Sequence, residues 1–160
     1  MTENIILGQP FSLSPEQACL CYKFMREFSR FEFALKQTGY SKQRGEQLIV
    51  DWRRFANEHQ LVCNSDFTDV AYILHSPPCR QVKLVDALGW KAIDAPPTPP
   101  SLFWLLDAAY VVRNNLFHGG KWTNETEASR DEALISAARG VICLALGVDE
   151  KVRTHYGDPV

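Results

Sequence analysis

The chain has 160 residues, 46% of them hydrophobic and 22% charged, and 17 basic against 19 acidic residues give a formal net charge of −2. This composition is typical of one soluble globular domain and excludes a disordered chain or a fibrous repeat. Because there is no positive excess, the molecule as a whole does not attract nucleic acid, and RNA binding would require a local basic patch.

The cysteines and the start of the sequence indicate a reducing compartment. The five cysteines form no CxxC pair and no Cys/His cluster with zinc-ligand spacing, so we expect free thiols and no metal or other cofactor. Residues 1–8 lack the basic start and apolar core of a secretory signal, and no apolar run reaches the roughly 18 residues that span a bilayer. We therefore expect a cytoplasmic protein that does not enter a membrane.

The first predicted element is a long helix. Ser14-Pro15-Glu16-Gln17 combines an N-cap, a proline suited to the first helical position and a glutamine that can complete a capping box. Gly39 suits the C-terminal cap. Apolar residues at spacings of three and four predict the buried face: Leu20, Phe24, Phe28, Phe31 and Leu35.

The middle of the chain is less regular. A second, more polar helix is expected over about 44–59, with an inner face made of Leu48, Trp52, Phe55 and Ala56. Asp66 suits the cap of a short helix that reaches Leu74, and 82–90 suits another short helix or an irregular segment. Four prolines within 95–100 predict a stiff connector, because they remove amide donors and fix φ.

The clearest helix begins after Ser101 and ends at Gly119-Gly120. Its predicted buried residues are Leu102, Leu105, Leu106, Ala109, Val112 and Leu116. A polar loop is expected over 121–127. Ser129 with Glu132 then repeats the capping-box pattern before a last helix that ends at Gly147.

No segment shows convincing strand alternation. The sequence therefore predicts an all-α bundle of about four principal helices plus short helices. We expect a single domain over 1–160, with 1–13 and 149–160 loosely held.

The most informative residues lie at the polar end of the helix that begins after Ser101. Arg113, Asn114, Asn115 and His118 bring together a fixed positive charge, two amides and a group that titrates near neutrality. Residues five apart on a helix lie about 140° apart around its axis, so Arg113 and His118 do not share a face. Either the helix unwinds at Phe117-His118, or a second copy completes the site across a two-fold axis.

These residue types suit cleavage of an RNA phosphodiester by its own 2′-hydroxyl. The reaction needs a base, an acid for the leaving oxygen and donors for the phosphate oxygens. One histidine from each of two subunits could supply base and acid, Arg113 the paired donors, and Asn114 a neutral orienting group, without a metal. Lys121 and Trp122 offer a cation and a stacking surface for flanking nucleotides. Asn115 is either a further substrate contact or a solvent-facing or helix-end amide.

The segment 113–121, Arg-Asn-Asn-Leu-Phe-His-Gly-Gly-Lys, resembles the motif of the HEPN superfamily in its prokaryotic, plasmid-borne branches. The resemblance implies a helical bundle, a homodimer with the motif at its interface, and a metal-independent endoribonuclease of the toxin or phage-defence kind. Its catalytic positions fall on Arg113, Asn114 and His118. An antitoxin or another defence-system protein is an implied partner. Gly120 departs from the tyrosine that nucleotidyltransferase partners modify in one branch.

Glu32 is a further candidate, because Arg30-Phe31-Glu32-Phe33 resembles a segment of related bundles. We expect its carboxylate to orient Arg113 or His118 from the first helix.

Plainer interpretations stay open beside this one. A catalytically inactive protein of the same fold would be a nucleic-acid or protein interaction module, and Arg113 alone could be a surface residue favoured by the helix dipole. The remaining polar and aromatic residues fit structural positions. On that interpretation the surface or loops hold His59, His75 and His155, the core holds Trp52, Trp90 and Trp104, and a solvated face holds Lys42, Arg44, Arg53 and Arg54.

Overall fold

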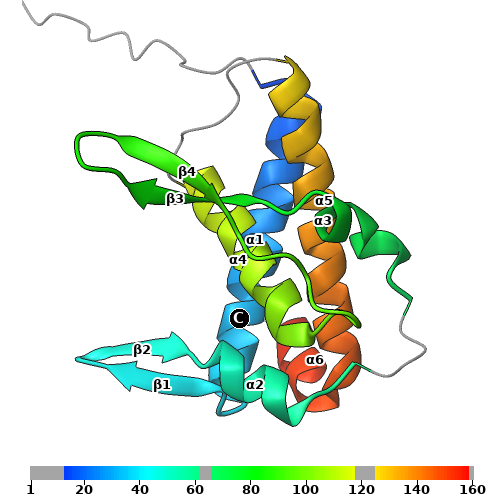
Figure 1. The fold of residues 1–160 in the computed structure, drawn as a ribbon. Helices are drawn as coiled ribbons and strands as arrows, with labels where there is room; N and C mark the ends of the chain where they lie inside the picture. The colour runs from blue at the N-terminus through cyan, green and yellow to red at the C-terminus, as the bar shows by residue number, and fades with distance from the viewer. Residues whose placement is uncertain (1–12, 62–65, 118–124, 159–160) are drawn as a thin grey trace, which may run out of the picture.

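The structure, a computed structural model, describes residues 13–61, 66–117 and 125–158 (Figure 1). These residues are mostly helical, as predicted. The helices are α1 (Pro15–Gln37), α2 (Trp52–Glu58), α3 (Ala71–His75), α4 (Leu102–Phe117), α5 (Glu125–Val148) and α6 (Glu150–Gly157), with a 3-10 turn at Thr68–Val70. None of the helices in these ranges is long and apolar enough to cross a membrane.

The prediction of a purely all-α chain is wrong, because two antiparallel hairpins occur. The first consists of β1 (Ser41–Arg44) and β2 (Gln47–Val50), and the second of β3 (Cys79–Lys83) and β4 (Leu88–Ala92). Both extend to the same side of the helical bundle (Figure 1). The fold is therefore a helical body with two short hairpins.

The first hairpin replaces the first half of the helix predicted over 44–59. Arg44 pairs with Gln47, which leaves Gly45-Glu46 as a two-residue turn, and Gly45 has a φ of 61°. Such turns require positive φ, which glycine adopts without steric cost. Leu48, expected on a buried helix face, consequently lies on β2 with 55% of its surface exposed. Only α2 remains of the predicted helix.

α1 begins and ends as predicted. Ser14 and Gln17 form both hydrogen bonds of a capping box, and Gly39 follows the C-cap Thr38 with a φ of 91°. Its predicted apolar face is buried at Phe24, Phe28, Phe31 and Leu35, with Leu20 partly buried. α1 therefore supplies much of the core, against which α5 and α6 pack.

α4 and α5 complete the body. Ser101 accepts a hydrogen bond from the Trp104 amide at the start of α4, as a cap should. Among the predicted inner positions of α4, five are buried and Leu116 is partly buried. α5 starts at Glu125, upstream of the predicted cap Ser129, and Gly147 lies within it. Glu132 accepts a hydrogen bond from Gln17 of α1 rather than capping its own helix.

The chain after Gly147 differs from the loosely held tail that we expected. Asp149 caps α6 by accepting hydrogen bonds from the amides of Lys151 and Val152, and the Val152 side chain is fully buried. Arg30 of α1 donates to the carbonyls of His155, Tyr156 and Asp158. These contacts hold residues 149–158 on α1; residues 1–12 lie outside the described ranges.

Candidate active site

Arg113 lies in the last described turn of α4 and faces α1. One of its terminal nitrogens is 3.6 Å from a carboxylate oxygen of Glu32, and the two side chains are 25% and 21% exposed. The expected contact between Glu32 and this arginine is therefore present. Because both groups are mostly shielded from water, solvent screens their attraction less than that of an exposed ion pair.

Three aromatic rings surround the same guanidinium. Its central carbon lies 5.8 Å from the ring centre of Phe28, 5.7 Å from that of Tyr110 and 4.9 Å from that of Phe117. Cations are attracted to aromatic faces at such distances. The rings therefore favour the charged side chain without occupying its donors, and the Nε atom is buried with no hydrogen-bond partner among the described residues.

The carboxylate of Glu32 occupies an unfavourable environment. Burial raises the pKa of Glu32, although the positive charges of Arg113 and Lys36 oppose the shift. The pairing with Arg113 therefore offsets only part of the cost of burying the carboxylate.

Asn114, the next residue of α4, forms a hydrogen bond with Arg113. Its Oδ1 accepts a hydrogen bond of 2.9 Å from Nη1 of Arg113. Since a guanidinium can only donate, this bond sets the orientation of the amide, and the nitrogen of Asn114 must face away from the arginine.

Asn115 is neither an exposed substrate contact nor a solvent-facing amide. It is only 7% exposed, and its amide nitrogen donates a 2.8 Å hydrogen bond to the carbonyl oxygen of Cys79 on β3. The solvent-facing interpretation is therefore wrong. Because Asn115 is buried and donates to β3, we assign this residue to holding β3 on α4 rather than to substrate.

Three other predicted site residues, His118, Lys121 and Trp122, lie outside the described residues, as do Gly119 and Gly120. The structure thus brings together Arg113, Asn114 and Glu32. His118 follows directly after Phe117, the last residue of α4.

Sequence reasoning missed the rings of Phe28, Tyr110 and Phe117 as neighbours of Arg113. Tyr110 and Phe117 stand three residues before and four after Arg113, spacings that place side chains side by side on a helix. That signal was available for these two rings, whereas Phe28 comes from α1 and only the packing of the helices reveals it.

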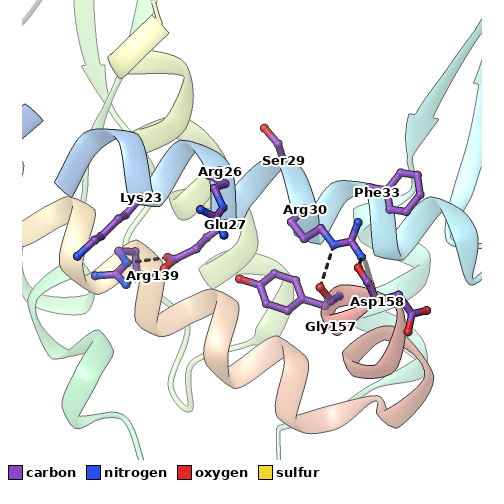
Figure 2. A pocket seen from close by; sticks show the side chains of 10 residues that line it. Lys23, Arg26, Glu27, Ser29, Arg30, Phe33, Arg139, Gly157 and Asp158 are labelled. Atoms are coloured by element: carbon purple, nitrogen blue, oxygen red, sulfur yellow. Dashed lines mark hydrogen bonds and ion pairs between the residues drawn. The ribbon is translucent and has the colours of Figure 1, made fainter. Parts of the chain in front are cut away.

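Another cavity lies elsewhere, between α1, α5 and α6, and has a volume of about 930 Å³. Figure 2 shows Arg139 of α5 bonded to Glu27 of α1, with contacts of 2.6 and 2.7 Å, and Arg30 bonded to the end of α6. Two lining cations, Lys23 and Arg26, are exposed. In this cavity Arg139, Glu27 and Arg30 are therefore all paired with other protein groups. We do not assign catalysis to the cavity.

A second polar cluster, also missed by sequence reasoning, ties α6 to the loop after α2. His59 Nε2 lies 2.8 Å from the Tyr40 hydroxyl and 3.0 Å from the Asp149 carboxylate, so His59 is not a free surface residue. Burial, together with the neighbouring Asp149, raises the pKa of Tyr40 to about 12. Burial opposes ionisation of Asp149, but hydrogen bonds from Val152, Tyr40 and Lys151 and the neighbouring His59 outweigh it and lower its pKa.

The other structural assignments are partly confirmed. Trp52 and Trp104 pack against the core, whereas Trp90 on β4 is 41% exposed and the core assignment for it is wrong. In the predicted basic cluster, Lys42 pairs with Asp51 at 3.6 Å and Arg54 with Glu58 at 2.9 Å. Both are surface ion pairs, which fits the predicted solvated face.

Comparisons with protein-family models, curated proteins and solved structures found no match for this chain.

Proposed function

We propose that the protein is a metal-independent endoribonuclease that acts as a homodimer, with Arg113, Asn114 and His118 as its catalytic residues. The observation that carries the proposal is the state of Arg113. Its guanidinium is oriented by Glu32 and three rings, yet the side chain keeps 25% of its surface exposed and its ion pair with Glu32 is 3.6 Å long. A guanidinium that is held in place and still partly exposed suits a group that receives a phosphate.

The reaction assigns a role to each residue. In a dimer, one His118 takes the proton of the ribose 2′-hydroxyl, and the second His118 protonates the leaving 5′-oxygen. The 2′-oxygen bonds to phosphorus as the bond to the 5′-oxygen breaks, which leaves a 2′,3′-cyclic phosphate and a 5′-hydroxyl. Arg113 stabilises the charge that develops on the phosphate oxygens, and Asn114 orients the phosphate or the hydroxyl.

Glu32 is a positioning residue in this proposal. Its carboxylate orients the guanidinium from α1 and, as an anion, would not itself bind the phosphate. The biological role that fits is that of a toxin or phage-defence effector restrained by an antitoxin or another defence-system protein.

The test is incubation of the purified protein with single-stranded RNA in EDTA, followed by analysis of the product ends. We expect fragments that carry 2′,3′-cyclic phosphates, no cleavage of 2′-O-methyl RNA, and loss of cleavage in His118→Ala. His75→Ala, which changes an exposed histidine of α3, is the matched control and should cleave normally.

Unbroken RNA under every condition, or full activity in His118→Ala, would contradict the proposal. An inactive protein that still binds RNA or another protein would instead be the interaction module. Light scattering of the purified protein tests the homodimer.

A further inference from the structure

A cavity adjoins the Arg113 site on the side of β3. It has a volume of about 410 Å³ and is lined by Asn114 and Tyr110 of α4 together with residues of the β3–β4 hairpin. This volume lies within the roughly 300–1,000 Å³ of small-ligand sites. Because Asn114 also accepts the hydrogen bond from Arg113, the cavity and the candidate active site share a residue.

Two amide side chains, those of Gln81 and Asn114, line this cavity. The Nε2 atom of Gln81 is buried and has no hydrogen-bond partner among the described residues. Asn114 presents its Oδ1 to Arg113, so its nitrogen faces away from the guanidinium. A buried donor without a partner is unfavourable, and a ligand that brings acceptor atoms would relieve that cost.

β3 is held on α4 at its start. The backbone carbonyl of Cys79 accepts a hydrogen bond from Asn115 of α4, and Gln81 follows two residues later on the same strand. Gln81 and Asn115 both line the cavity, which places Gln81 beside α4.

The charge of the cavity is positive. No aspartate or glutamate is among its described lining residues, which include Arg80 and Lys83. Arg80 is matched by Asp107, with contacts of 3.0 and 2.8 Å, whereas Lys83 has no ion pair within the described chain. An anionic group of a bound ligand would therefore pair with Lys83.

The remaining walls are apolar. Tyr110 contributes an aromatic ring, and Leu88 of β4 is 64% exposed at the rim. A flat ring that carries acceptor atoms and an attached anion would match these walls, the two amides and the lysine together. A nucleotide has that combination of groups.

We propose that this cavity holds one nucleotide of the RNA strand beside the scissile phosphate. Its phosphate lies at Lys83, its base lies against Tyr110 and Leu88, and base acceptor atoms face Gln81 and Asn114. The inference rests on the proposed ribonuclease function and names the substrate contacts of that site.

The test measures binding separately from cleavage. In the His118→Ala background, a fluorescent single-stranded RNA oligonucleotide is titrated into the protein, alone or with Gln81→Leu or Lys83→Ala added. The matched controls are Gln47→Leu on β2 and Lys91→Ala on β4, both exposed positions that do not line the cavity.

We expect Gln81→Leu to weaken RNA binding roughly 2- to 10-fold, the range for one net hydrogen bond. Lys83→Ala should weaken binding and reduce the slope of log affinity against log salt by about 0.7, the value for one phosphate on a single strand. In the active protein, Lys83→Ala should raise KM and leave kcat unchanged. The control variants should bind as the parent does, and thermal melts should show that all are folded.

The outcomes separate the two proposals. RNA cleavage by the unaltered protein, with normal binding by both cavity variants, overturns the cavity inference and leaves the ribonuclease proposal in place. Weaker RNA binding by both cavity variants of a protein that never cleaves RNA supports the cavity and contradicts catalysis. Absence of any oligonucleotide binding by the His118→Ala protein also overturns the inference.

Discussion

The two sides of α1 each bear a glutamate that pairs with an arginine of another helix. The two pairs differ in how fully the glutamate engages the arginine. Glu27 receives two short hydrogen bonds from Arg139, at 2.6 and 2.7 Å. Glu32 makes a single 3.6 Å ion pair with Arg113, whose Nε keeps no partner among the described residues. A bidentate pair is complete in itself, whereas the looser pair positions a cation that can still bind an anion.

The largest expected difference between the two pairs is in catalysis. Arg113→Ala should lower the rate of RNA cleavage about 10²- to 10³-fold, as loss of one donor to a developing anion does in other enzymes. Arg139→Ala is the matched control and should cleave at a rate close to that of the unaltered protein. Cleavage of a labelled RNA under single-turnover conditions measures both. Equal losses in the two variants would mean that the pairs do not differ in function.

The next largest effect is on the free energy of unfolding, on the side of α1 that bears Glu27. Arg30→Ala removes the donor to three carbonyls at the end of α6 and should lower the free energy of unfolding by about 1–3 kcal/mol. Arg26→Ala, on the same exposed face, should change it by less than about 0.5 kcal/mol. Urea unfolding of both variants measures the difference. If Arg26→Ala were the more destabilising change, the account of α6 anchoring would be wrong.

The smallest effect is a pH dependence with opposite signs at two carboxylates. Folding raises the pKa of Glu32, so the folded state binds its proton more tightly, and its contribution to stability falls as pH rises above the ordinary value of 4.5. Folding lowers the pKa of Asp149, so its contribution is present above the ordinary value of 3.8 and is lost as pH falls.

Substitution of each carboxylate by its neutral amide isolates its pH-dependent contribution to stability. From about pH 4 to pH 7, unfolding measurements should show Glu32→Gln gaining stability relative to the unaltered protein, and from about pH 2.5 to pH 5 they should show Asp149→Asn losing it. Asparagine still caps a helix, so Asp149→Asn removes mainly the charge. The same trend in both variants would contradict the assigned shifts.

Much of the helical body could be predicted because its signals are local. The capping box at Ser14, the cap at Ser101 and the spacing of the buried phenylalanines each lie within a few turns of one helix. The hairpins could not be predicted by the same means, since strands of four or five residues are too short for alternation to stand out. In the first hairpin, only Gly45 marks the turn.

The candidate site was predictable in part for the same reason. Arg113 and Asn114 were found from one helix, and Glu32 was proposed from the resemblance of its segment. The Tyr40–His59–Asp149 cluster joins residues up to 109 positions apart in the chain, and no local pattern indicates it. The cavity beside Asn114 likewise depends on where β3 lies against α4, which only the packing reveals.

The hydrogen bond from Asn115 to the Cys79 carbonyl has a consequence for how this protein can vary. This bond fixes the position of the β3–β4 hairpin, proposed to bind one nucleotide, relative to α4, which carries the proposed catalytic residues. Divergence in the hairpin could then alter which RNA sequences are chosen while the cutting residues stay in place, provided that an amide is kept at position 115.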